Sequence, residues 1–278
     1  MKAAPFAYER PSDLKSALAL MAETKETAKI IAGGQSLGPM LNLRLVQPEL
    51  IIDIAGLAEL KRADQNGDEL LIGACITHGD IEDGRIPDVT RGAMQRVAAA
   101  IAYRAVRNRG TIGGSLSHAD PAADWLSALP ALGARVRLRG PNGIRDLAVE
   151  DFITGALESA LQPGEMVEAI RVPVMRPSAR WGYFKACRKP GEFAHAIAAV
   201  MIDPEAQNAS VAIGAIEKKP IVLRDAASLF GGRITGSFRQ QFDARLADAL
   251  LAKAGVANAA DRHIHVAVLR RAIDEAAA

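Results

Sequence analysis

Two short glycine-rich loops contain the residues of this chain that are best suited to binding a ligand. The first loop consists of Ala32, Gly33, Gly34, Gln35, Ser36 and Leu37, and the second consists of Thr111, Ile112, Gly113, Gly114 and Ser115. Paired glycines let the backbone approach a ligand closely and direct its N–H groups at an anion. A pyrophosphate suits such a loop, and two loops of this kind predict a dinucleotide.

Neither loop has the spacing of the common nucleotide-binding motifs. The first lacks the G-x-G-x-x-G pattern with its following acidic residue, and the chain has no Gly-Lys-Ser/Thr sequence of a P-loop. A lone Gly-Gly pair is more often only a tight turn, so the hypothesis of dinucleotide binding depends on the full sequences of both loops. Those sequences favour a flavin dinucleotide over a nicotinamide dinucleotide.

Predicted secondary-structure elements precede both loops and would position them. Residues 29–32 read as a short strand that ends at the first loop, and residues 88–106 read as one long helix that leads to the second. Further strands are predicted at residues 50–54, 70–76 and 167–174, a hairpin at 135–144 around an Asn-Gly turn, and a helix at 122–132.

The composition of the chain changes after Pro177. Three predicted strands, at residues 182–185, 194–202 and 209–216, are followed by two amphipathic helices at 238–252 and 260–276. Strands followed by helices are typical of an α+β arrangement. We therefore predict two domains, residues 1–177 and residues 178–278.

The bulk composition excludes several classes of partner. The 278 residues carry a net charge of only +2, which favours neither nucleic acid nor an anionic membrane. Cys75 and Cys187 lie far apart in no motif, so we expect free thiols and a reducing compartment. Two cysteines cannot supply the four ligands that a 2Fe-2S cluster normally needs. No signal peptide and no apolar stretch of ~20 residues is evident, so we expect a cytoplasmic protein without a membrane span.

Longer segments around the loops resemble the FAD-binding medium subunit of the molybdenum hydroxylases, the carbon monoxide dehydrogenase and xanthine dehydrogenase family. They read AGGQSLGPMLNLRL at residues 32–45 and TIGGSLSHADPAADW at residues 111–125. Residues 48–54 and 183–194 resemble further family segments, so the resemblance covers nearly the whole chain. It implies a two-subdomain FAD-binding domain of the vanillyl-alcohol-oxidase (PCMH) type. A small C-terminal α+β domain with a three-stranded sheet and helices would follow.

The resemblance also implies a role for each matching residue. Both glycine loops would hold the FAD pyrophosphate through backbone N–H groups. Asp124 would accept a hydrogen bond from the sugar or ribityl part of FAD, and Ile101 would border the channel from adenine to flavin. Lys185 would lie near the isoalloxazine ring, with Val167 packed beside it. We expect no catalytic side chain and no metal ligand, because the flavin itself is the reacting group.

Some residues depart from the family pattern or keep two interpretations. Gln35 stands where many relatives have histidine, and Ser115 where many have asparagine; both retain hydrogen-bonding capacity. Phe193 would either stack on the flavin ring or pack in the core. His263 and His265 are two positions apart on a predicted helix, so they face different sides and do not predict a metal pair.

The function implied by the resemblance is electron transfer. A large subunit would carry a molybdenum-pterin cofactor and oxidise the substrate, and a small subunit with 2Fe-2S clusters would relay electrons to FAD in this chain. FAD would pass them to an external acceptor, and a dimer of heterotrimers is the family expectation. Two alternatives are a stand-alone flavin oxidoreductase on the same superfold and a flavin-free scaffold subunit.

Overall fold

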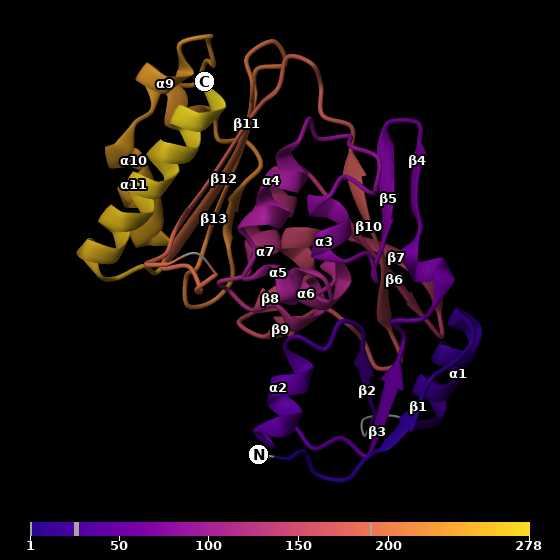
Figure 1. Cartoon of the computed structure of the whole chain (residues 1–278). Coiled ribbons are helices and arrows are strands. Elements are labelled where there is room, and N and C mark those ends of the chain that lie inside the picture. The colour runs from indigo at the N-terminus through magenta and orange to yellow at the C-terminus, as the bar shows by residue number, and fades with distance from the viewer. Residues whose placement is uncertain (1, 25–27, 190) are drawn as a thin grey trace.

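Three larger sheets and their covering helices make up the computed structural model, which describes residues 2–24, 28–189 and 191–278 (Figure 1). The first sheet is parallel and has the order β1-β3-β2, with β1 at Ala7–Glu9, β2 at Ala28–Ile31 and β3 at Leu50–Asp53. Helix α1 (Leu14–Thr24) packs on this sheet through Ala17. Helix α2 (Leu37–Asn42) follows the first glycine loop.

The second sheet is antiparallel and has the order β4-β5-β10-β6-β7. Its strands are β4 (Ala63–Asn66), β5 (Glu69–Gly73), β6 (Arg135–Gly140), β7 (Gly143–Ala148) and β10 (Met166–Pro173). In β6, Val136 and Leu138 are fully buried whereas Arg135 is exposed, so one face of the sheet lies against the core. Strands β6 and β7 are antiparallel neighbours joined by a short turn, which confirms the predicted hairpin at 135–144.

Short helices and turns pack between this sheet and the rest of the chain. They are η2 (Ala58–Lys61), α3 (His78–Glu82), α4 (Ala93–Ala100), α5 (Arg104–Arg107), α6 (Ile112–His118), α7 (Asp124–Ala131) and α8 (Val149–Phe152), with the small strand pair β8 (Ile153–Gly155) and β9 (Glu158–Ser159). Every residue of α7 is buried, as expected for a helix that is apolar on nearly all sides.

The third sheet is antiparallel, with the order β11-β12-β13-β14. Its strands are β11 (Arg180–Ala186), β12 (Ala196–Asp203), β13 (Asn208–Gly214) and β14 (Ile221–Leu223), so the short β14 adds a fourth strand to the three predicted. The turn η3 (Ala227–Phe230) and helices α9 (Phe238–Gln241), α10 (Ala244–Lys253) and α11 (Ala259–Ala276) follow. Figure 1 shows α10 and α11 on one face of this sheet, and α7 packs on β12 and β13 from the other.

The prediction of one helix over residues 88–106 is wrong. The chain instead forms α4 and α5, separated by Ala102 in the left-handed region at φ 39°. Arg107 stabilises the break, because its guanidinium donates to the carbonyls of Ile101 at 2.9 Å and Ala102 at 3.0 Å. At the other end, the Asp88 side chain accepts from the N–H groups of Thr90 and Gly92 and so delays the helix start.

The predicted helix at 238–252 is also divided. Phe242 is extended at ψ 118°, which separates α9 from α10. Asp243 then caps α10 by accepting from the N–H groups of Arg245 and Leu246. A buried aromatic, Phe242, followed by an aspartate cap is the local signal for the break.

A single large apolar cluster joins the segments on both sides of residue 177. It contains Trp125 and Leu126 of α7 together with Trp181 of β11 and Ile197 of β12. The division into residues 1–177 and 178–278 stays a prediction. None of the helices within the described ranges is long and apolar enough to cross a membrane.

Candidate FAD-binding site

The first glycine loop lies against the segment that leads into the second. A Cβ atom added to Gly33 would lie 1.9 Å from the carbonyl oxygen of Arg109 and 2.9 Å from Cα of Gly110. No side chain fits at that distance, so glycine is required for the contact. The structure thus brings together two loops that are about 75 residues apart in the sequence, as dinucleotide binding by both would require.

The first loop offers a row of unused hydrogen-bond donors. In the described part of the chain, the backbone N–H groups of residues 33–37 have no acceptor. Gly34 is in the left-handed region at φ 71°, and the Gln35 amide donates to the Gly33 carbonyl at 3.1 Å, which closes the loop on itself. Consecutive free N–H groups form an anion-binding concavity, so the loop fits a pyrophosphate.

The second loop has already used most of its donors. Four consecutive N–H groups donate to protein oxygens: Ile112 to Ile76 O at 3.0 Å, Gly113 to Ala74 O at 3.0 Å, Gly114 to Thr111 Oγ1 at 3.1 Å and Ser115 to Thr111 O at 3.0 Å. A Cβ on Gly113 would lie 2.5 Å from Cβ of Ala74, so this glycine serves close packing. The donors left for a ligand are the Thr111 N–H and the hydroxyls of Thr111 and Ser115, which donate to no acceptor among the described residues.

His78 connects the second loop to helix α7. Its backbone N–H donates to the Gly110 carbonyl at 2.9 Å, and its Nδ1 accepts from the Trp125 indole at 3.1 Å. Burial and the nearby Arg107 lower the pKa of His78 to about 4, so the ring is neutral and Nδ1 is free to accept. A Thr77–Asp80 capping box starts the helix at this point.

Asp124 and Lys185, predicted separately, form a buried ion pair. Lys185 Nζ lies 2.7 Å from Asp124 Oδ1, and both side chains are 9% exposed. The Tyr183 hydroxyl donates to the same Oδ1 atom at 2.6 Å, and Lys185 also donates to the Ala100 carbonyl at 2.6 Å. Burial and the adjacent carboxylate raise the pKa of Tyr183 well above its ordinary value, so the phenol stays a donor.

Each member of this pair keeps capacity for a ligand. The Lys185 ammonium has three N–H groups and uses two of them within the described residues. Asp124 Oδ2 accepts no hydrogen bond from any residue that the structure describes, whereas Oδ1 accepts two. The arrangement therefore offers an acceptor for a ligand hydroxyl beside a donor with positive charge.

The remaining predicted residues differ in how closely they approach this pair. Ile101 follows Ala100, whose carbonyl binds Lys185, so it lies directly beside the pair and is half-buried. Val167 lies on β10 opposite Leu138, at a register irregularity, and is buried in the large apolar cluster. Phe193 is 74% exposed, so core packing is excluded for it, and stacking on the flavin stays a prediction.

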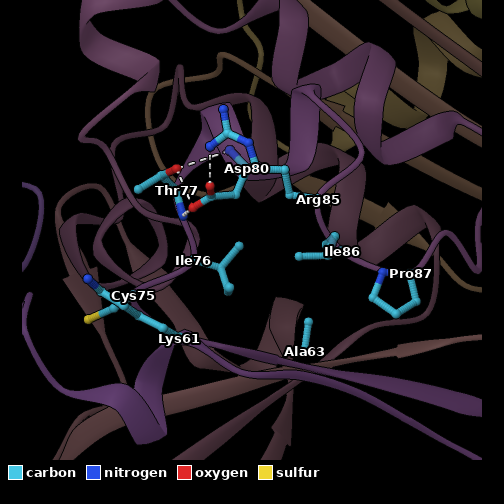
Figure 2. A pocket seen from close by; sticks show the side chains of 9 residues that line it. All are labelled: Lys61, Ala63, Cys75, Ile76, Thr77, Asp80, Arg85, Ile86 and Pro87. Carbon is cyan, nitrogen blue, oxygen red and sulfur yellow. Dashed lines mark hydrogen bonds and ion pairs between the residues drawn. The ribbon is translucent and has the colours of Figure 1, made fainter.

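A cavity of about 430 Å³ lies near the second loop but contains none of the predicted site residues. Figure 2 shows its lining: Lys61, Ala63, Cys75, Ile76, Thr77, Asp80, Arg85, Ile86 and Pro87. Its one basic residue outside an ion pair with a described partner is Lys61, since Arg85 pairs with Asp80 and Asp83. Burial raises the pKa of the Cys75 thiol to about 12, so this cysteine carries almost no thiolate at neutral pH.

No group of three metal-ligating side chains occurs in the described ranges. The two histidines of α11 face different sides, as predicted, because His263 is exposed and His265 is buried. Cys75 and Cys187 are both free thiols.

Comparisons with known proteins place this chain in one class, the FAD-binding domains of molybdopterin dehydrogenases. Residues 4–175 match the family described as the FAD binding domain in molybdopterin dehydrogenase. The caffeine dehydrogenase subunit beta of Pseudomonas sp. (strain CBB1) is 34% identical over 97% of this chain and 100% of its own. The carbon monoxide dehydrogenase medium chain of Afipia carboxidovorans is 31% identical over 98% of this chain and 97% of its own.

A solved structure supports the same assignment. A chain of carbon monoxide dehydrogenase from Hydrogenophaga pseudoflava superimposes with a TM-score of 0.88 at 30% identity, covering 99% of this chain and 98% of that chain. The protein therefore belongs to the family of FAD binding domains in molybdopterin dehydrogenases. It is an FAD-binding medium subunit of the molybdenum hydroxylase type and part of an oxidoreductase, which confirms the resemblance and the α+β fold class.

Proposed function

We propose that this chain holds FAD at its two glycine loops and at the Asp124–Lys185 pair, and uses it to transfer electrons. The observation that carries the proposal is the row of unused N–H groups at residues 33–37, in a loop that packs on Arg109 and Gly110 just before the second glycine loop. Bound FAD supplies a ring that accepts electrons singly and releases them as a pair.

The residues of the chain bind and orient the cofactor. The N–H groups of the first loop, together with the Thr111 N–H and the Ser115 hydroxyl, hold the pyrophosphate. Asp124 Oδ2 accepts from a ribityl hydroxyl, and the unused N–H of Lys185 points its charge at the pyrimidine edge of the ring. Ile101 and Val167 provide apolar walls.

The partners follow from the names of the relatives and from this chain's cysteine count. Medium-chain relatives belong to multi-subunit enzymes, and two free cysteines cannot hold a 2Fe-2S cluster here. We therefore propose a small iron–sulfur subunit as the electron donor and a large molybdenum-pterin subunit as the site of substrate oxidation. A cytoplasmic dimer of such heterotrimers, with this chain divided at residue 177, completes the proposal.

The substrate belongs to the large subunit in this proposal. Relatives named for caffeine and for carbon monoxide resemble this chain to a similar extent, 34% and 31% identity, although their named substrates are chemically unrelated. A medium subunit that contacts no substrate explains why such different enzymes share it. The external acceptor, which takes electrons from FAD, is a separate property of the complex.

An absorption spectrum of the purified chain, with mass identification of the released cofactor, tests the proposal. We expect flavin bands without iron–sulfur bands, and reduction of the flavin only when the partner subunits and their substrate are added. Reduction of the isolated flavoprotein by a substrate of its own would identify a stand-alone oxidoreductase. A chain that binds no FAD, alone or in its complex, would be a scaffold and would contradict the proposal.

A further inference from the structure

A hydrogen-bond network includes the Asp124–Lys185 pair and connects four elements. It runs from Arg96 of α4 to Glu275 of α11, from Glu275 to the backbone N–H of Tyr183 on β11, and from the Tyr183 hydroxyl to Asp124 of α7. The bonds measure 2.6, 3.1 and 2.6 Å in that order. Lys185 donates both to Asp124 and to the carbonyl of Ala100, which lies on α4 four residues after Arg96. The network therefore begins and ends on α4.

Strand geometry explains why Tyr183 and Lys185 act together. They are two positions apart on β11, so both side chains project from the same face of the sheet toward α4 and α7. Phe184, between them, projects to the other face, where Arg271 of α11 lies 5.1 Å from its ring. The position of the Tyr183 side chain is therefore determined by where strand β11 lies.

Glu275 fixes that placement. β11 is an edge strand, and the Tyr183 N–H, which is not used in the sheet, donates to Glu275 Oε2. Helix α11 can come this close because Gly182 has no side chain, and a Cβ there would lie 1.8 Å from the Ala272 carbonyl. Arg96 holds the other oxygen of the Glu275 carboxylate and ties α11 to α4.

We infer that Tyr183 and Glu275 are positioning residues for the cofactor: they hold Asp124 Oδ1 and Lys185 Nζ so that Asp124 Oδ2 and one ammonium N–H stay directed at FAD. Without the Tyr183 hydroxyl, Oδ1 keeps Lys185 alone as a donor among the described residues, and the orientation of the carboxylate is less restricted. Without Glu275, the Tyr183 N–H loses its acceptor, and this part of β11 is held to α11 by packing alone, so Tyr183 and Lys185 shift with it. This inference rests on the proposed FAD role of Asp124 and Lys185.

Titration of the full-length apo chain with FAD, followed by flavin fluorescence, tests the inference. Loss of one charge-assisted hydrogen bond corresponds to ~10-fold in an equilibrium constant, so we expect Tyr183→Phe to raise the Kd for FAD by about 10-fold. The midpoint potential of the bound FAD should also fall, because a displaced ammonium stabilises the reduced ring less. Glu275→Ala should change both quantities in the same direction.

The chain offers matched controls for both variants. Tyr8 also donates its hydroxyl to an aspartate, Asp53, but in the N-terminal sheet, so Tyr8→Phe should leave the Kd unchanged. Asp274, next to Glu275 on α11, makes an ion pair with Arg239, and its side chain is 35% exposed against 33% for Glu275. Asp274→Ala should therefore leave FAD binding unchanged.

A double variant separates positioning from a general loss of structure. If Tyr183 acts through Asp124, whose Oδ1 accepts its hydroxyl, then Tyr183→Phe should change the Kd by less than twofold in an Asp124→Ala background. Equal effects in both backgrounds, or wild-type Kd and potential in both Tyr183→Phe and Glu275→Ala, would overturn the inference. If Asp124→Ala itself binds FAD as the wild type does, the proposed function is at fault.

Discussion

Lys185 and Asp124 are 61 residues apart in the sequence, and their charged atoms are 2.7 Å apart in a setting where each side chain is 9% exposed. One lies on the third sheet and the other on the first turn of α7. The contact therefore links the C-terminal sheet to the glycine-loop region that precedes it. A buried pair of this kind is costly to disrupt on one side only, because the remaining charge has no solvent around it.

Removing the charge of Asp124 should destabilise the chain. Asp124→Asn leaves the Lys185 ammonium buried without a counter-ion, and we expect the free energy of unfolding to fall by about 3 kcal/mol. Urea denaturation of the apo chain measures the change. Adding Lys185→Met to this variant should recover much of the loss, because no charge then remains buried.

An exposed ion pair provides the control for this prediction. Arg239 and Asp274 lie 2.6 Å apart, but Arg239 is 58% exposed, so solvent screens the pair. Arg239→Ala should cost less than about 1 kcal/mol. Similar losses in Asp124→Asn and Arg239→Ala would show that burial of the Asp124–Lys185 pair has no energetic consequence.

Gly33 should tolerate no side chain, whereas Gly38 should. A Cβ at Gly33 meets the Arg109 carbonyl at 1.9 Å, while a Cβ at Gly38, in the following helix, meets no atom of the described residues within 4 Å. We expect Gly33→Ala to separate the two loops and to weaken FAD binding by at least 10-fold, on the scale of ~1.4 kcal/mol per factor of ten. Gly38→Ala should bind FAD normally, and equilibrium dialysis distinguishes the two.

Gly113 should behave differently from Gly33. Its N–H is already bonded to Ala74, and a Cβ there would lie 2.5 Å from Cβ of Ala74, so Gly113→Ala should destabilise the fold itself. We expect a lower thermal midpoint in the apo chain, with FAD binding lost as a consequence. A Gly113→Ala chain that keeps its thermal midpoint but loses FAD would show that the second loop meets the cofactor directly at this glycine.

Local sequence patterns were sufficient to place most elements and both loops. Ile30, Ile31 and the glycines after them define the first strand and its loop, and Pro177 falls between the second and third sheets. The helix expected at 88–106 failed because its alanine-rich composition supports a helix throughout. The break at Ala102 depends on Arg107 reaching back to the carbonyls of Ile101 and Ala102, and helix propensity does not report such a side-chain contact.

The candidate site was predicted as separate residues rather than as an arrangement. Asp124 and Lys185 were each assigned to FAD, but their mutual contact needs α7 and β11 to be adjacent, which only the packing of the third sheet decides. The signal that was available is the two-residue spacing of Tyr183 and Lys185 on a strand. Glu275 carried no signal, since a glutamate near the end of a helix usually faces solvent.

Stability should fall on mild acidification because of His78. Its pKa is lowered from 6.5 to about 4, so the unfolded chain binds a proton over this range and the folded chain does not. The contribution of the neutral His78 ring to the free energy of unfolding is complete above pH 6.5 and is lost as the pH falls toward 4. We expect the free energy of unfolding to fall by about 2 kcal/mol between pH 7 and pH 5. Urea denaturation at the two pH values measures it.

His78→Asn isolates this contribution. Asparagine can still accept a hydrogen bond from Trp125 but does not titrate, so the loss between pH 7 and pH 5 should shrink in the variant. His265, whose pKa burial also lowers, is present in both proteins and cancels in the difference. An equal loss in wild type and variant would assign the pH dependence to other groups.

Thiol labelling should distinguish the two cysteines and report on the cofactor. Cys75 is 2% exposed with a pKa raised by burial to about 12, so it has almost no thiolate at pH 8. Cys187 is half-buried and lies two positions after Lys185. A thiol-specific reagent should modify Cys187 alone in the folded chain and both cysteines in urea.

Cys187→Ser should abolish labelling of the folded chain, and bound FAD should slow labelling of the wild type. Labelling at a rate that FAD does not alter would place the cofactor away from this part of the chain.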